Sequence, residues 1–437
     1  MQNIGEKFLV KGLDGKKTLV GEICVNGAKN AVLKAMASSV LFKDGIILKN
    51  VPNIEDVNRM SDLLEALGIV VKKTSRKMFE FDVRKLESGN FSPEISKQLR
   101  ASIVLAGPLL ARIGKISFPH PGGCVIGARP VDLFLDGFKK MGAKIKKNGE
   151  NYIIETKKGK LTGAEIFFKN QSVTATETFM MAGILADGET ILKNCALEPE
   201  ILHLAEFLNS CGAKITGAGT STIKIKGGKL LSSKGDIYIT PPDRIEAGSF
   251  LILGALSAKK IKITNCEPAY VESLIELLRE SGVKIEVGKN FIEVGSDLSK
   301  NILLKAVNVK THEYPGFPTD LQAPMVVYLT QTHGESMVFE TIFEGRLNYT
   351  EELSRMGADI KPMDPHRVIV TGPSLLHGRD MESPDLRAGL AFLIAAIFAK
   401  GDSFIHNVYN IDRGYERVEE RLKSIGVDIE RIKINDK

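Results

Sequence analysis

Segments rich in small and hydrophobic residues recur along the chain, and each is apolar on nearly every side of a helix. Six segments share this pattern: 30–42, 100–113, 175–186, 246–258, 320–331 and 385–399. A surface helix keeps one polar face, whereas a helix that is apolar all round is typical of a buried position. The pattern therefore predicts six helices in the protein interior.

A second pattern recurs in step with the first. It is an amphipathic, leucine-rich stretch, then a glycine, then alternating polar and apolar residues. The glycines are Gly68, Gly142, Gly212, Gly282, Gly357 and Gly426, and successive members are 69 to 75 residues apart. Self-similarity at so regular a period indicates a repeated structural unit. Each glycine is predicted to end a helix in the left-handed conformation, with a strand after it.

One repeat reads as strand, buried helix, strand, amphipathic helix, strand and strand, which is an α/β pattern. Six such units are too many for one core, so we expect two domains of three units each. The sixth unit stops one strand short, and a spare strand-like segment, 8–25, precedes the first. We therefore expect a discontinuous domain (1–28 with 242–437), closed by the N-terminal strand, and an inserted domain (29–241).

Composition narrows the functional classes. The 437 residues are 43% hydrophobic and 26% charged, as in globular proteins, and the net charge of +6 is spread along the chain. Tryptophan is absent and aromatic residues make up 6%, which disfavours a base-stacking surface for nucleic acid. No signal-peptide core or long apolar run occurs. We expect a soluble, cytoplasmic protein with no membrane, nucleic-acid or obligate protein partner.

The cysteines and histidines indicate neither a disulfide framework nor a metal site. The five cysteines (Cys24, Cys124, Cys195, Cys211 and Cys266) include no C-x-x-C pair, and the seven histidines form no cluster with ligand spacing. We expect no metal and no cofactor. Cys124 differs from the others because it follows two glycines in a loop, "PHPGGCVIGARPVDL", which favours a reactive thiol, whereas the other four are interpreted as core residues.

Basic residues cluster at predicted helix starts: Lys29, Arg100, Arg129, Arg244, Arg346, Arg387 and Arg413. A cation there is disfavoured by about 0.3–1 kcal/mol. A salt bridge or a solvated side chain explains any single one of them. Together they favour a multiply anionic small-molecule ligand, because guanidinium groups and helix N-termini both bind phosphate and carboxylate.

Two aspartates share these positions. Asp320 and Asp385 each lie at the predicted start of a buried helix. Either residue can cap its helix, and either can act as a general base beside the cations. The sequence leaves both roles open. For Asp320 the two are nearly even, whereas for Asp385 capping is favoured over the role of a base.

Several long motifs resemble one family. "NGAKNA" (26–31), "PGGCVIGARPVDL" (121–133), "FPTDLQA" (317–323), "DLRAG" (385–389) and "IDRGYER" (411–417) together resemble the UDP-N-acetylglucosamine 1-carboxyvinyltransferases, which are enolpyruvyl transferases. The resemblance covers essentially the whole chain. It implies an inside-out α/β barrel of two similar domains, and transfer of the enolpyruvyl group of phosphoenolpyruvate to the 3′-hydroxyl of UDP-N-acetylglucosamine.

The resemblance also implies site residues. The catalytic residues would be Cys124, as proton donor on its loop, Asp320, as the base near the sugar hydroxyl, and the phosphoenolpyruvate-binding Lys29 and Arg413. The other substrate-binding residues would be Asn30, Arg100, Arg129, Pro130, Val131, Asp132, Leu133, Ser172, Val173, Thr174, Ile342, Arg346, Asp385 and Arg387.

Two other functions compete with this hypothesis. The shikimate 3-phosphate enolpyruvyl transferases share the implied fold, but their glycine-rich "GNAGT"-type motif is missing here and the cysteine loop is present. A non-catalytic nucleic-acid-binding protein is disfavoured by the scarcity of aromatic residues and the absence of a lysine stripe.

Overall fold

A computed structural model describes residues 5–119, 131–295 and 303–434 of the chain. These residues form two compact units. The discontinuous unit comprises 5–26 with the described residues from 242 onward, and the inserted unit comprises 27–119 with 131–241. Each unit has its own hydrophobic core. Within the described residues, no helix is both long and apolar enough to cross a membrane.

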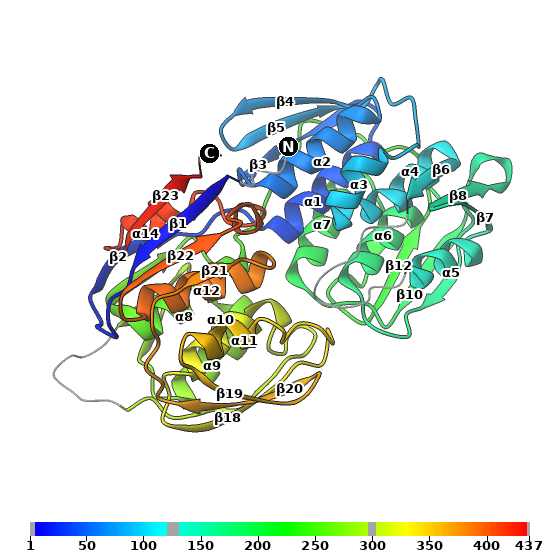
Figure 1. The fold of residues 1–437 in the computed structure, drawn as a ribbon. Coiled ribbons are helices and arrows are strands. Elements are labelled where there is room, and N and C mark those ends of the chain that lie inside the picture. Colours follow the sequence, from blue (N-terminus) through cyan, green and yellow to red (C-terminus); the bar gives the residue numbers. More distant parts are fainter. Residues whose placement is uncertain (1–4, 120–130, 296–302, 435–437) are drawn as a thin grey trace. The chain divides into compact units, whose positions relative to one another are not determined.

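Three buried helices form the centre of the inserted unit (Figure 1). They are α1 (Lys29–Ser38), α4 (Ala106–Ile113) with the preceding 3₁₀ helix η2 (Arg100–Leu105), and α6 (Val173–Ile184). Four further helices are partly exposed: α2 (Glu55–Ala66), α3 (Pro93–Gln98), α5 (Asp132–Lys140) and α7 (Pro199–Ser210).

Three sheets belong to the inserted unit. The first has the order β13 (Ile237–Ile239), β3 (Gly45–Lys49), β5 (Met78–Asp82) and β4 (Val70–Ser75). The second is β6 (Lys115–Pro119), β8 (Asn151–Thr156) and β7 (Ala143–Asn148). The third is β11 (Ile215–Thr216), β12 (Thr222–Lys226), β10 (Glu189–Lys193) and β9 (Glu165–Phe167).

The discontinuous unit repeats this plan. Its buried helices are α8 (Arg244–Ser257), α10 (Gln322–Leu329) and α12 (Leu386–Phe398), which pack against one another. The prediction of buried helices is thus confirmed for all six segments. The partly exposed helices are α9 (Glu272–Glu280), α11 (Thr350–Arg355), α14 (Val418–Lys423) and the single turn α13 (Tyr409–Asp412).

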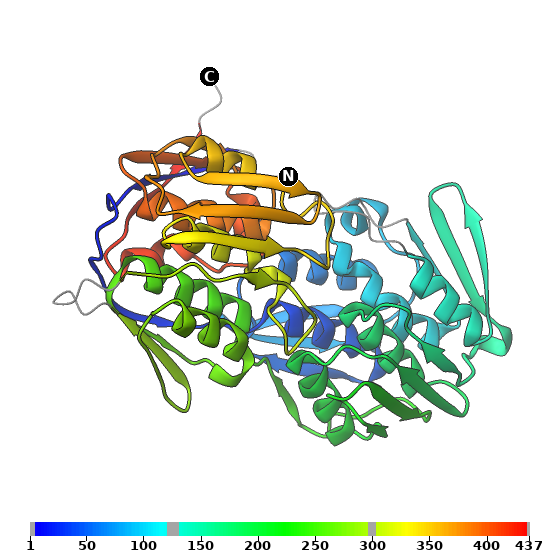
Figure 2. The same cartoon turned by 90° about the horizontal axis from the view of Figure 1, so that it is seen from below.

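The three sheets of this unit have four strands each. One is β15 (Ile285–Val287), β16 (Phe291–Gly295), β14 (Ala258–Thr264) and β2 (Leu19–Cys24). The next is β17 (Val309–Lys310), β18 (Gly334–Phe339), β20 (Arg367–Gly372) and β19 (Asp359–Asp364), of which β18 to β20 lie side by side in yellow and orange in Figure 2. The last is β21 (Asp380–Glu382), β22 (Asp402–His406), β1 (Glu6–Lys11) and β23 (Asp428–Lys433).

The N-terminal segment contributes two strands to different sheets. β1 lies between β22 and β23, and Phe8 is paired with Ile405 on one side and Arg431 on the other. In the sheet of β17 to β20 the corresponding third strand is β20, which comes from the same repeat as its neighbours β18 and β19. β2 pairs in parallel with β14. The sequence predicted that the segment 8–25 is one spare element. In the structure it supplies two strands: β1 joins β22 and β23 in one sheet, and β2 joins β14 in another.

The repeated glycines end helices as predicted. All six have positive φ angles, between 84° and 110°. Five lie two residues beyond the last residue of their helix, and Gly426 lies three beyond the end of α14. This left-handed conformation is costly for residues with a Cβ atom, and it releases the chain into the following strand.

The interpretation of Cys24 as a core residue is wrong. Cys195, Cys211 and Cys266 are buried, but Cys24 is exposed. It is the last residue of β2, whose side chains alternate between the two faces, with Leu19 and Ile23 pointing into the core. Cys24 therefore falls on the solvent face of its strand.

Candidate functional site

Asp320 and two arginines form a charged cluster in the discontinuous unit. Arg346 Nη2 donates to Asp320 Oδ1 at 2.7 Å, and Arg387 Nη2 donates to Asp320 Oδ2 at 2.8 Å. The two arginine side chains are only 5% and 7% exposed, whereas that of Asp320 is 26% exposed. The carboxylate therefore remains accessible in front of two buried cations.

The two arginines keep Asp320 ionised. Burial by itself would raise the pKa of Asp320, but the charges of Arg387 and Arg346 and their hydrogen bonds outweigh it and hold that pKa well below its ordinary value. Burial by itself would lower the pKa of Arg387, but Asp320, Asp243 and Tyr415 together outweigh it, so that pKa is raised. Asp320 does not cap a helix, since α10 begins at Gln322 after Leu321.

The start of α12 positions Arg387. The carboxylate of Asp385 accepts hydrogen bonds from the backbone N–H groups of Arg387 (2.7 Å) and Ala388 (3.1 Å). The capping role of Asp385 is thus confirmed. Arg387 Nη1 donates to Tyr415 Oη at 2.9 Å, so the guanidinium group bridges Tyr415 and Asp320. Burial raises the pKa of Tyr415, and the phenol stays neutral.

Not every basic residue lies where the sequence pattern predicted. Lys29, Arg100, Arg244 and Arg387 begin their helices or lie one residue inside. Arg346 instead lies in the turn before α11, and Arg413 follows the end of α13, so both predictions of a helix start are wrong. A single four-residue turn ending before "RGYER" gives no periodicity by which sequence alone could place it.

The turn that carries Arg413 is held by a dense ion cluster. Arg431, on β23, donates to both carboxylate oxygens of Asp412, at 2.8 Å each, and also to Glu419 and Glu6. Three carboxylates around one guanidinium group fix Asp412, the residue before Arg413.

Lys29 and Asn30 open α1 in the inserted unit. Lys29 Nζ lies 2.6 Å from Asp56 Oδ2, and both side chains are largely buried. Lys34, one turn further along α1, donates to the backbone carbonyl of Asn30 at 2.6 Å and lies 3.2 Å from Glu177 Oε2 of α6. Burial raises the pKa of Glu177 to about 7. These contacts fix the first turn of α1.

Ser172 caps α6, the helix that opens with Val173 and Thr174. Its Oγ accepts a hydrogen bond from the backbone N–H of Ala175 at 3.2 Å. Val131 is buried at the N-cap position of α5, with Asp132 exposed and Leu133 half-buried behind it. Cys124, Arg129 and Pro130 lie outside the described residues.

Comparison with known proteins assigns the family. The sequence matches the EPSP synthase (3-phosphoshikimate 1-carboxyvinyltransferase) family over residues 13–422. It is 43% identical to a UDP-N-acetylglucosamine 1-carboxyvinyltransferase of Koribacter versatilis over 98% of this chain and 96% of the relative. A UDP-N-acetylglucosamine 1-carboxyvinyltransferase 1 of Caldanaerobacter subterraneus is also 43% identical, over 97% of this chain and 99% of its own. The chain belongs to the UDP-N-acetylglucosamine 1-carboxyvinyltransferase family.

Solved structures confirm the fold of this carboxyvinyltransferase family member. The enolpyruvyl transferase NikO from Streptomyces tendae aligns with a TM-score of 0.84 at 21% identity, over 98% of this chain and 99% of its own. An EPSP synthase from Acinetobacter baumannii aligns with a TM-score of 0.72 at 18% identity, over 98% and 100%. The enolpyruvyl transferase fold and the assignment to the transferases are both confirmed.

Several residues of this family member's charged cluster were not predicted from the sequence. Thr319, Glu340 and Tyr415 all lie on the chain of hydrogen bonds around Arg346 and Arg387. Thr319 and Tyr415 lie within motifs already noted, "FPTDLQA" and "IDRGYER", but their types alone indicated no role. Glu340 lies directly after a strand, where a carboxylate is more often solvated.

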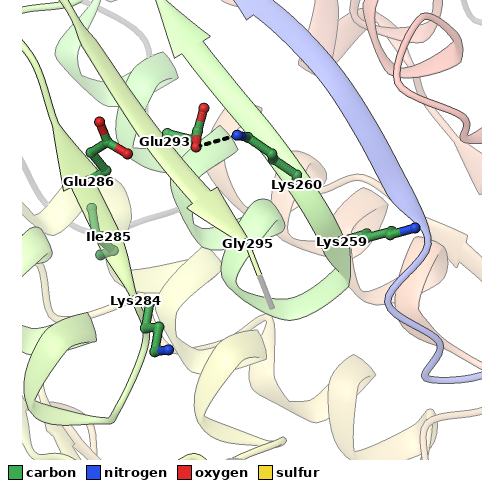
Figure 3. A pocket seen from close by; sticks show the side chains of 7 residues that line it. All are labelled: Lys259, Lys260, Lys284, Ile285, Glu286, Glu293 and Gly295. Carbon is green, nitrogen blue, oxygen red and sulfur yellow. Dashed lines mark ion pairs between the residues drawn. The ribbon is translucent and has the colours of Figure 1, made fainter. Parts of the chain in front are cut away.

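Figure 3 shows a hollow on a different part of the discontinuous unit, on the sheet of β14 to β16. Its charged side chains come from Lys259, Lys260, Lys284, Glu286 and Glu293, and Lys260 already pairs with Glu293 at 2.9 Å. It contains none of the site residues predicted from the sequence. Among the described residues, no group of three histidines, cysteines or carboxylates could hold a metal ion.

Proposed function

We propose that this protein transfers the enolpyruvyl group of phosphoenolpyruvate to the 3′-hydroxyl of UDP-N-acetylglucosamine and releases phosphate. The observation that carries the proposal is the accessible carboxylate of Asp320 in front of buried Arg346 and Arg387. Relatives at 43% identity that are named for this reaction support the nucleotide-sugar as acceptor. The reaction would be the first committed step of peptidoglycan synthesis, in the cytoplasm.

The reaction has two stages. In the addition stage, C3 of phosphoenolpyruvate gains a proton from Cys124, and the sugar oxygen forms a bond to C2 while its own proton passes to Asp320. In the elimination stage, the Cys124 thiolate takes a proton back from C3 while phosphate leaves C2, which restores both the double bond and the thiol. Atoms balance, and no redox partner is needed.

The arginines control the basicity of Asp320. While both donate to its carboxylate, Asp320 is a weak base. The carboxylate and phosphate of phosphoenolpyruvate compete for the same guanidinium groups, and each hydrogen bond that moves to the substrate makes Asp320 more basic. Substrate binding would thus prepare the base for the hydroxyl proton. Lys29, Asn30 and Arg413 would bind the phosphoenolpyruvate anion.

The test is phosphate release from phosphoenolpyruvate with UDP-N-acetylglucosamine or, separately, shikimate 3-phosphate as acceptor. We expect release only with the nucleotide-sugar, and its loss in Cys124→Ala. Release with shikimate 3-phosphate but not with UDP-N-acetylglucosamine would show that the proposed acceptor is wrong. An active Cys124→Ala variant would keep the reaction but assign the proton on C3 to another donor.

A further inference from the structure

Glu340 is a buried carboxylate that accepts four hydrogen bonds. It follows β18 directly, and its side chain has no exposed surface. Its Oε1 accepts from the backbone N–H groups of Ile342 (2.8 Å) and Phe343 (3.1 Å) and from Thr311 Oγ1 (3.1 Å). Its Oε2 accepts from Thr319 Oγ1 at 2.8 Å. A buried charge is tolerated only with donors of this number.

Three of these donors, Thr319, Ile342 and Phe343, come from two separate segments that hold candidate site residues. Thr319 precedes Asp320 in the 3₁₀ helix η5 (Thr319–Leu321). Ile342 and Phe343 lie in the turn that leads to Arg346, and the backbone N–H of Arg346 donates to the carbonyl of Phe343 at 3.2 Å. One carboxylate therefore ties the Asp320 segment to the Arg346 segment.

Glu340 also sets the direction of a hydrogen-bond chain. The Thr319 hydroxyl has one proton, and it donates that proton to Glu340. Its lone pairs are then free to accept from Arg346 Nη1 at 2.8 Å, while Arg346 Nη2 donates to Asp320. Every donor in the chain Glu340–Thr319–Arg346–Asp320 has an acceptor only if the Glu340 side chain accepts the hydroxyl proton of Thr319.

We propose that Glu340 is a positioning residue, which orients Arg346 toward Asp320 through the Thr319 hydroxyl; this rests on the proposed function. The hydrogen bonds described for the Glu340 side chain do not include Asp320, so Glu340 acts on it through Thr319 and Arg346. Its charge, and not only its shape, matters, because an amide at this place would donate to Thr319 and leave the hydroxyl proton without its acceptor.

Two near-isosteric variants test the chain. Glu340→Gln keeps the amide oxygen as an acceptor for Ile342 and Phe343 but replaces Oε2 by a donor. Thr319→Val removes the hydroxyl. We expect each to lower kcat by roughly tenfold or more, the effect of losing a hydrogen bond to a charged group. The KM for UDP-N-acetylglucosamine should change little in Glu340→Gln, because the turn at Ile342 keeps its acceptor. Thr319→Ser restores the hydroxyl and should recover most of the rate.

The double variant distinguishes a chain from two separate effects. If Glu340 acts through Thr319, Glu340→Gln combined with Thr319→Val is no slower than the slower single variant. Tyr328→Phe is the control for a purely structural loss, because it removes a buried hydrogen bond to Ser281 (2.6 Å) in the same unit. It should lower the Tm and leave kcat unchanged.

The outcomes separate the two proposals. A wild-type protein that releases no phosphate from phosphoenolpyruvate and UDP-N-acetylglucosamine would overturn the proposed function. An active wild-type protein would overturn the role of Glu340 if either single variant kept the wild-type kcat, or if the two losses multiplied in the double variant.

Discussion

The carboxylate of Asp320 accepts a hydrogen bond at 2.8 Å from the guanidinium group of Arg387, a residue 67 positions further along the chain. Because Arg346 donates to the other carboxylate oxygen, one anion separates two buried cations. The same anion is therefore important for both the stability of the discontinuous unit and the chemistry proposed for it.

Asp320→Asn should be both inactive and less stable. We expect kcat to fall by at least about a hundredfold, the usual contribution of a general base. We also expect the free energy of unfolding to fall by about 3 kcal/mol, because removing the carboxylate leaves the charges of the two buried arginines uncompensated. Initial rates and denaturant titration measure the two effects.

Asp428→Asn is the matched control in the same unit. Asp428 pairs with Lys11 at 3.0 Å, and both side chains are 56% exposed. This change should lower the free energy of unfolding far less than Asp320→Asn does, because an exposed ion pair contributes little to stability. Equal losses of stability in the two variants would contradict a special role for Asp320 in balancing charge.

Since the pKa of Asp320 is lowered, its contribution to stability should persist at neutral pH and disappear only as the pH falls far below the ordinary pKa of a carboxyl group.

Glu177 should make the stability depend on pH in the opposite sense. Burial raises its pKa to about 7 from an ordinary value of 4.5. The folded state then holds a proton that the unfolded state has lost, so stability falls as the pH rises between these two values. The full difference corresponds to roughly 3 kcal/mol. Glu177→Gln should abolish this part of the pH dependence.

The measurement is denaturant unfolding of the wild type and of Glu177→Gln at several pH values from 5 to 8. Titration of other groups is common to both proteins and cancels in the difference. Glu165→Gln serves as the control, because Glu165 pairs with Lys193 at the surface and is 57% exposed. A wild-type curve parallel to that of Glu177→Gln would show that Glu177 does not titrate in this range.

Local features of the chain were predictable from sequence, and contacts between distant segments were not. The helix-ending glycines and the capping by Asp385 depend on a few neighbouring residues, and both are confirmed. The role of Asp320 stayed open between cap and base because Arg346 and Arg387 reach it from elsewhere in the fold. Glu340 was missed for the same reason, since only the folded chain brings Thr319 to its carboxylate.

Two of the repeated glycines allow the cost of a positive φ angle to be separated from the cost of crowding around an added Cβ atom. Gly212 has a φ of +105°, and a Cβ atom added there would have no neighbouring atom within 4 Å. A Cβ atom at Gly357 (φ +110°) would instead lie 2.6 Å from the carbonyl oxygen of Leu375. Gly212→Ala should therefore cost only the backbone strain, about 1–2 kcal/mol. Gly357→Ala should cost about 1–3 kcal/mol more, because the backbone at Leu375 must move. Thermal unfolding of both variants measures the difference, and equal Tm values would contradict the crowding argument.

Cys124 should be the residue through which the thiol-alkylating antibiotic fosfomycin inactivates the protein. We expect treatment in the presence of UDP-N-acetylglucosamine to abolish turnover and to add the mass of one inhibitor to the Cys124 peptide. Cys124→Asp should resist, because a carboxyl group can still supply a proton but is not a thiolate nucleophile. Unchanged wild-type turnover after treatment would count against the assignment.

The other cysteines provide the controls for this experiment. Burial raises the pKa of Cys195 and of Cys266 to about 11, so their thiols stay protonated and unreactive near neutral pH. Cys24 is exposed and is the competing site for alkylation among the described cysteines. Cys24→Ser should be inactivated at the wild-type rate. Resistance of Cys24→Ser together with inactivation of Cys124→Asp would show that the reactive thiol is Cys24. The test would then not support Cys124 as the proton donor.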